Sequence, residues 1–160
     1  MTSSSRTRRG RHAWLVTLLC AHAATAWAAL GETQASVERE GTQLGARRSV
    51  AAMMRYTVQE LQLPDGSRVV QYLAGNGRVF ALRWNTRSKP DLSVLLGSAF
   101  PGYASAAQAA AQHGGIQRQF RHDDSDVVVQ SSGHLQAYVG YAYRRSLLPP
   151  GVSVASLGWE

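Results

Sequence analysis

The 160-residue chain has a single cysteine, Cys20, and this scarcity excludes a disulfide framework and a cysteine-based zinc site. Its main apolar run, 13–21, covers about half of the roughly 20 residues that a membrane-spanning helix needs. The chain has no glycine-rich loop of the phosphate-binding type, since Gly75-Asn76-Gly77 lies between two predicted strands rather than before a helix. The whole chain is 44% hydrophobic, which indicates one folded domain, neither disordered throughout nor a multi-span membrane protein.

The first 28 residues have the layout of a cleavable secretion signal. Four arginines and no acidic residue precede the apolar run, and Ala26-Trp27-Ala28 then supplies the small-x-small pattern of a signal peptidase site. We expect cleavage after Ala28, with a retained membrane anchor as the disfavoured alternative because the apolar run is short. The pair Arg8-Arg9 leaves the twin-arginine route open beside the general export route.

Cleavage changes the charge of the protein. Removing 28 of the 160 residues leaves 132, and the loss of four arginines lowers the basic count from 17 to 13 against 10 acidic residues. The net charge therefore falls from +7 to +3, and the only cysteine leaves with the leader. A mature chain of this length buries enough surface for one core without disulfides.

The first part of the mature chain predicts little regular structure and then a meander. We expect 29–52 to be loosely structured, with a possible short helix capped by Thr33 and running through Val37 to Leu44. Strands are predicted over 56–63, 68–73 and 78–84, joined by Pro64-Asp65-Gly66 and Gly75-Asn76-Gly77. Such short turns require antiparallel neighbours. The alternation slips between Val58 and Leu61, which predicts a bulge there.

A helix is predicted to begin at Pro90-Asp91 and to end at His113-Gly114-Gly115. Its apolar stripe recurs at three- and four-residue spacing, which is typical of packing on a sheet. Pro101 predicts a kink, or two helices meeting near Phe100. The stripe consists of Leu92, Leu95, Leu96, Ala99, Tyr103, Ala106, Ala107 and Ala110.

The last part of the chain predicts strands again. Candidates are 116–121 and 126–130, and 135–143 alternates strictly after a predicted turn at Ser132-Gly133. Leu148-Pro149-Pro150-Gly151 stops this strand. The fold class expected for 53–160 is therefore α+β: an antiparallel meander of three strands, a bent helix or helix pair, and a further antiparallel hairpin.

The chain combines the stretches 27–31, Leu63-Pro64-Asp65-Gly66, Pro90-Asp91-Leu92, Leu95-Leu96-Gly97, 126–134 and Leu148-Pro149-Pro150-Gly151-Val152. Together they resemble a family of small exported bacterial proteins known only as a domain of unknown function. The resemblance covers nearly all of the mature chain and implies export and a single domain. It assigns no reaction, so no catalytic residue follows from it.

The segment from His122 to His134 is the best candidate for chemistry. With a turn at Ser132-Gly133, Ser131 would face His134 across the hairpin, as a nucleophile and its base require. The strained elbow of serine hydrolases is absent. His122, Asp123, Asp124 and His134 are suitable metal ligands, although their spacing matches no standard site. The sequence thus assigns no catalytic residue, no metal ligand and no cofactor.

A binding face is the favoured alternative. Aromatic rings beside arginines can hold sugars, peptides or anionic groups by stacking and forked hydrogen bonds. Candidates lie on the last strand, in the cluster that also contains Arg87 and Lys89, and at Arg144-Arg145. At the end of an apolar strand, Trp84 is more often a core residue than a binding residue. The candidate binding residues are Trp84, Arg83, His134, Gln136, Tyr138 and Arg144.

The sequence therefore favours a non-enzymatic domain in the periplasm or secreted, which binds an envelope component or another exported protein. The alternative is a small hydrolase or metal-dependent enzyme that uses the His122–His134 segment. A net charge of +3 without an arginine stripe along a helix disfavours nucleic acid. After signal cleavage, no transmembrane segment is expected.

Overall fold

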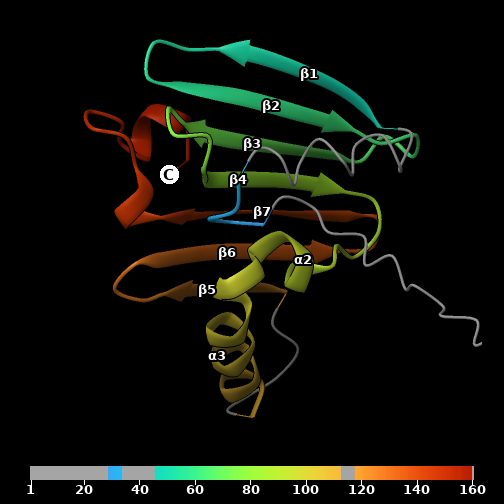
Figure 1. Cartoon of the computed structure of the whole chain (residues 1–160). Coiled ribbons are helices and arrows are strands. Elements are labelled where there is room, and N and C mark those ends of the chain that lie inside the picture. Colours follow the sequence, from blue (N-terminus) through green and yellow to red (C-terminus); the bar gives the residue numbers. More distant parts are fainter. Residues whose placement is uncertain (1–28, 34–45, 113–117, 160) are drawn as a thin grey trace, which may run out of the picture.

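Seven antiparallel strands form one continuous sheet in the computed structural model, which describes residues 29–33, 46–112 and 118–159 (Figure 1). The strand order is β1-β2-β3-β4-β7-β6-β5. Two meanders, β1 to β4 and β5 to β7, therefore join through the pair β4–β7 in the middle of the sheet. The strands are β1 (Arg47–Ala52), β2 (Tyr56–Gln62), β3 (Arg68–Ala74), β4 (Val79–Thr86), β5 (Gln119–Asp123), β6 (Val127–His134) and β7 (Ala137–Arg144).

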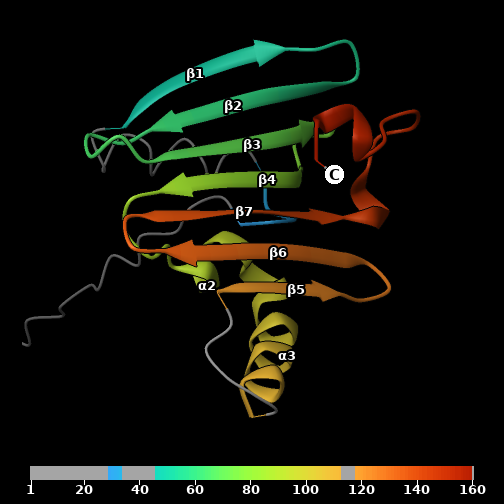
Figure 2. The same ribbon diagram turned by 180° about the vertical axis from the view of Figure 1, so that it is seen from behind.

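One helical segment connects the two meanders. It consists of α2 (Leu92–Leu96), the 3-10 turn η1 (Gly97–Ala99) and α3 (Phe100–Gln112). In Figure 1 the α2 turn lies in front of the sheet and in Figure 2 behind it, while α3 extends past the edge strand β5 in both views. The segment thus covers only one face of the sheet, near the strands β5 to β7.

The expected α+β architecture is wrong. The domain is a mostly β domain with one substantial helix among its described residues, because α2 has only five residues and does not make a helix pair with α3. The first meander has four strands, and its extra strand β1 lies within 29–52, where the sequence predicts none. All six residues of β1 are exposed, so the buried-face alternation that reveals a strand is missing there.

The two faces of the sheet carry two separate cores. The face under the helical segment buries Leu82, Trp84, Val129 and Ala142 together with Leu95, Leu96 and Tyr103. The opposite face is covered by the chain after β7, whose 3-10 turns η2 (Arg145–Leu147) and η3 (Ala155–Leu157) precede Trp159. Burial on both faces explains why Phe80-Ala81-Leu82 in β4 is buried without alternation.

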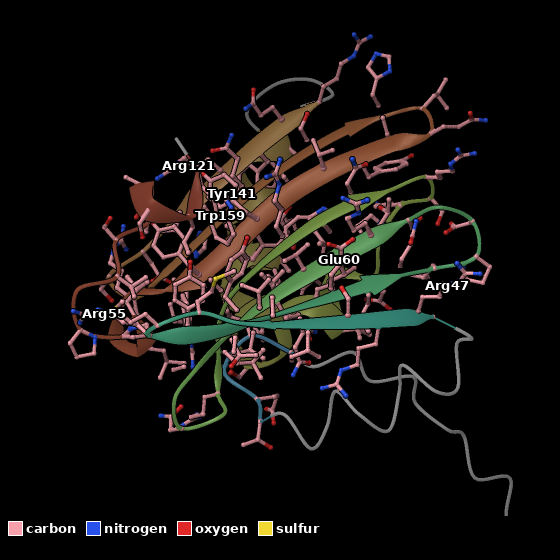
Figure 3. The ribbon with its side chains drawn as sticks, turned by 90° about the horizontal axis from the view of Figure 1, so that it is seen from above. Arg47, Arg55, Glu60, Arg121, Tyr141 and Trp159 are labelled. Atoms are coloured by element: carbon pink, nitrogen blue, oxygen red, sulfur yellow. The ribbon has the colours of Figure 1, made fainter. Side chains whose placement is uncertain are left out.

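Trp159 anchors the second core. Its ring stacks on Tyr141 with centroids 5.2 Å apart and meets Tyr72 edge-on at 5.1 Å. Figure 3 shows Trp159 beside Tyr141 and Arg121, and Arg121 donates a hydrogen bond of 3.1 Å to the Tyr141 hydroxyl. Burial raises the pKa of Tyr72, an effect that the nearby Arg83 opposes. The C-terminal chain is thus part of the fold.

The irregularity predicted in β2 lies elsewhere. β2 pairs with β3 in continuous register, and the shift occurs at Tyr72/Leu73, between β3 and β4. The apolar alternation slips because Gln59 occupies a fully buried position directly opposite Gln71, which is also fully buried. A polar side chain at a core position looks like a bulge in the sequence.

The start of the helical segment follows its sequence signals. The Asp91 carboxylate caps α2 by accepting hydrogen bonds from the backbone N–H groups of Ser93 and Val94. α2 ends at Gly97, whose φ of +51° favours glycine and whose missing side chain leaves room for Ala29. The break expected near Pro101 is the 3-10 turn before α3.

The described residues at the N-terminal side are tied to the sheet. Leu30 is 1% exposed in the core under the helical segment, and Thr33 forms a bridge with Arg78. The leader 1–28 and the remainder of the expected short helix, 34–45, lie outside the described residues. Within the described part of the chain, no helix is long and apolar enough to cross a bilayer.

Candidate ligand-binding groove

A groove of about 770 Å³ lies between α3 and the sheet, on the face that the helical segment covers. Its floor follows from the strand register. One row across the sheet consists of Trp84 (β4), Gly140 (β7), Ser131 (β6) and Phe120 (β5), which are consecutive register partners. Because same-face residues alternate along a strand, the next row outward is Thr86, Tyr138, Gly133 and Arg118.

Each of these two rows contains a glycine beneath an aromatic ring. A side chain on Gly140 would come within 2.6 Å of Cε2 of Trp84 and closer still to the Gln130 carbonyl oxygen, so the indole lies directly on the backbone of β7. A side chain on Gly133 would lie 3.1 Å from the Tyr138 ring. These glycines let both rings pack against the sheet backbone. The half-buried Tyr138 ring faces the groove, and Trp84, which is 1% exposed, closes its base.

The roof is formed by residues too small to fill that space. Tyr103 is the only buried residue of α3, and the following positions toward the groove are Ala107 and Ala111. Leu92 and Pro90 close the side next to β4. A mostly aromatic and aliphatic cavity of this volume is typical of a small-molecule site.

A hydroxyl pair lies at the inner part of the groove. The Tyr103 hydroxyl and the Ser131 hydroxyl are 2.8 Å apart and hydrogen-bond each other. The Tyr103 ring meets Phe120 edge-on at 5.4 Å and His122 at 6.4 Å. Tyr103 is therefore fixed by contacts with two strands, and it joins the roof to the floor.

The structure places two of the six candidate binding residues in the groove. Trp84 and Tyr138 line it, and Trp84 is also a core residue at 1% exposure. Arg83 lies on the opposite face of the sheet, because neighbours along a strand alternate. Arg144 lies at the far end of β7, with its Nε 3.5 Å from an Asp126 carboxylate oxygen.

The other two candidates, His134 and Gln136, lie at the tip of the β6–β7 hairpin. His134 pairs with Ala137, so the turn consists of Leu135 and Gln136, and Gln136 has φ of +63°. The predicted turn at Ser132-Gly133 is wrong. Gly133 lies within β6, where its missing side chain makes room for the ring of Tyr138. The real turn has Gln136 at the position with positive φ, so no glycine marks this turn in the sequence.

The pairing of β6 with β5 and β7 also keeps apart the residues that the hydrolase hypothesis requires to be close together. Ser131 pairs with Gly140 rather than facing His134, and the two side chains point to opposite faces of β6. His122 pairs with Val129, which places it about 17 Å along β6 from His134. The structure does not bring the proposed nucleophile and base together.

The acidic turn between β5 and β6, Asp123 to Asp126, has its carboxylates engaged in the fold. Asp123 accepts hydrogen bonds from Arg145 at 2.6 Å and Arg121 at 2.9 Å. Asp124 accepts from the backbone N–H of Val127 at 2.6 Å and of Asp126 at 2.8 Å, and its second oxygen lies 3.2 Å from Nε2 of His122. Within the described residues, no group of three or more potential ligands is placed to hold a metal ion.

The pKa values of the three aspartates follow these contacts. The Arg145 and Arg121 guanidinium groups lower the pKa of Asp123. Backbone N–H groups of Val127 and Asp126 lower the pKa of Asp124, and the backbone N–H of Ser146 lowers that of Asp126. All three groups are held as carboxylates, which suits a structural turn.

Sequence reasoning missed Tyr103, Phe120, Ser131 and Arg118 as groove residues. The sequence places Tyr103 in the packing stripe of the helix, and this prediction is correct, since Tyr103 is 8% exposed. The only available signal was the run of alanines after it, whose small side chains leave space. Small side chains on a helix indicate a groove only when the position of the helix over the sheet is known, and the sequence does not show that α3 lies over β5 and β6.

The fold and groove define a class: a small mostly β domain with one antiparallel sheet and a lined cavity under its helix. The chain belongs to the family described as "Protein of unknown function (DUF2844)", whose model matches residues 26–157. The expected membership of a family of unknown function is thus confirmed. A search of curated proteins and a search of solved structures each gave no match.

Proposed function

We propose that this protein is an exported, non-enzymatic binding domain that holds a small, largely apolar component of the cell envelope in its groove. The observation that carries the proposal is the groove of about 770 Å³ between the half-buried Tyr138 and the alanines of α3, with the buried Trp84 at its base. Side chains that merely stabilise a core would fill this space, because protein interiors are close-packed.

The arrangement of the polar residues supports a non-enzymatic role. In the described part of the chain, the carboxylates of the acidic turn bind arginines and backbone N–H groups, and the Ser131 hydroxyl bonds to Tyr103. Glu60, a half-buried carboxylate within β2, forms an ion pair of 2.9 Å with the exposed Arg68 of β3. These groups have structural partners of their own.

Binding in the groove is tested with a neutral apolar dye, N-phenyl-1-naphthylamine, whose fluorescence rises in apolar sites. We expect saturable binding, weakened at least about ten-fold in Ala107→Trp, which extends an indole into the groove. Gln108→Trp adds the same side chain at an exposed position of α3 and should bind the dye as the parent does. Ala111→Phe, at an exposed position of the groove lining, provides a second blocking variant if Ala107→Trp folds poorly. Equal dye binding by all variants would refute the groove as the site.

Export is tested separately by expressing the full chain in a bacterium with an outer membrane. We expect the periplasmic or secreted fraction to contain a protein that begins at Ala29, as N-terminal sequencing would show. A full-length protein confined to the cytoplasm would contradict export, without bearing on the groove.

A further inference from the structure

The polarity of the groove changes in one direction along the strands. The innermost row of that face, Leu82, Ala142 and Val129, is completely buried. The next row outward carries the Trp84 indole, and the outermost row ends in the exposed Arg118. We call the outermost row the mouth of the groove. Four strand residues separate it from the innermost apolar row, which corresponds to roughly 14 Å.

Lys89 and Arg118 stand on two sides of this mouth. Lys89 follows the end of β4, and Arg118 precedes the start of β5, so both lie at the same end of the antiparallel sheet. Two strands, β7 and β6, separate β4 from β5. The two cations therefore flank the groove instead of forming one cluster.

The charge at the groove is of one sign. Its lining includes Lys89 and Arg118 and no acidic residue. Neither cation forms an ion pair with any carboxylate of the described residues. The helical roof adds no formal charge, since 92–112 contains no Asp, Glu, Lys or Arg. An anion at the mouth would meet two cations that lack a partner, while an apolar chain would meet only aromatic and aliphatic groups.

Resting on the proposed binding function, we infer that the ligand is an amphiphile with an anionic head group. Its head lies between Lys89 and Arg118, and its apolar part extends over Tyr138 and Trp84 toward Tyr103. A neutral apolar compound would leave both cations without a partner. A small anion without an apolar part would leave the aromatic floor uncovered.

The test compares three ligands with the same chain and different heads: dodecanoate, 1-dodecanol and dodecyltrimethylammonium. Each ligand is added to the protein with the neutral dye bound, at concentrations below micelle formation and at mildly alkaline pH. The measured quantity is the ligand concentration that displaces half of the dye. We expect dodecanoate to displace the dye at about five- to ten-fold lower concentration than the alcohol, with the cationic ligand weakest. High salt should reduce this preference, since exposed charges are screened.

A double variant, Lys89→Gln with Arg118→Gln, isolates the contribution of the mouth. In this variant the ratio of the dodecanol to the dodecanoate concentration that displaces half of the dye should fall to about one, whatever the affinity of the variant for the dye itself. The matched control, Arg47→Gln with Arg83→Gln, removes two exposed cations outside the groove and should keep the preference. Equal displacement by the acid and the alcohol, or a preference that survives in the double variant, would overturn the inference while leaving the groove intact as a site. Absence of dye binding in the parent protein would instead overturn the proposed function, and the inference with it.

Discussion

The indole of Trp84 lies on the backbone of Gly140, its register partner on the neighbouring strand. This contact joins the two meanders at the centre of the sheet and forms the floor of the groove. An added Cβ at Gly140 would lie 2.6 Å from Cε2 of Trp84, and it would also approach the Gln130 carbonyl oxygen of β6. Neither the strand backbone nor the buried indole can move away without opening the core.

Replacing Gly140 with alanine should therefore destabilise the protein strongly. We expect the free energy of unfolding to fall by about 3 kcal/mol, at the upper end of the usual cost of overpacking. Urea denaturation followed by circular dichroism measures the change. Gly75→Ala is the matched control, because an added Cβ there meets no atom within 4 Å. Its stability should stay within about 0.5 kcal/mol of the parent, and equal effects of both substitutions would refute the contact.

The hydrogen bond between Tyr103 and Ser131 connects α3 to β6. Tyr103→Phe should lower the free energy of unfolding by about 1 kcal/mol, because it removes one hydroxyl and leaves the other without this partner. Ser131→Ala should have a similar effect, and the double variant should cost less than the sum of the single variants. The cycle is measured by urea denaturation. Strict additivity of the two substitutions would mean that the hydroxyls do not interact in solution.

Trp159 is near the C-terminus, yet it is 5% exposed and packs on Tyr72 and Tyr141. Trp159→Ala should lower the free energy of unfolding by about 3 kcal/mol, since it removes a buried aromatic side chain. Leu135→Ala, at the 89%-exposed hairpin tip, should change it by less than about 0.5 kcal/mol. Thermal unfolding of the two variants makes the comparison. A Trp159→Ala variant as stable as Leu135→Ala would show that the C-terminal chain contributes little to the core.

The lowered pKa values of the acidic turn predict that the stability of the protein depends on pH. The pKa of Asp124 in the folded protein is held below its ordinary value near 3.8 by the backbone N–H groups of Val127 and Asp126. A lowered folded pKa contributes stability that is present above the unfolded value and is lost as the pH falls through the folded value. The melting temperature of the parent should therefore decrease below about pH 4. Asp124→Asn removes this titration, so its melting temperature should decrease less steeply over the same range. Parallel curves for the two proteins would exclude Asp124 as a contributor.

The sequence identified the strands that have turn residues at their ends. The predicted segments 56–63, 68–73 and 78–84 correspond to β2, β3 and β4, because Pro64-Asp65-Gly66 and Gly75-Asn76-Gly77 mark their limits. β1 was missed because it is exposed on both faces. The pairing of β4 with β7 could not be predicted, since it depends on where the helical segment crosses the sheet.

The candidate site was less predictable than the strands. Trp84 and Tyr138 were selected for their chemistry, and the structure places both in the groove. The candidates His134 and Gln136 depend on a predicted hairpin turn at Ser132-Gly133, which would place both residues on the last strand. The real turn lies at Leu135-Gln136. A glycine that makes room for a ring and a glycine that makes a turn look alike in a sequence, so register errors of this kind follow from local patterns alone.

Gln59 offers a test of how the core tolerates polar groups. Its side chain is 0% exposed, and within the described part of the chain its amide nitrogen and oxygen have no hydrogen-bond partner. Because burying an unpaired amide is costly, Gln59→Met should raise the free energy of unfolding by about 1 kcal/mol while keeping the side-chain shape. Gln62→Met, at an exposed position of the same strand, should leave it unchanged within about 0.5 kcal/mol. Urea denaturation of both variants and of the parent protein measures these free energies of unfolding. If Gln59→Met is less stable than the parent, the amide has a partner in solution, and the burial of a glutamine in β2 is a stabilising feature of the sheet.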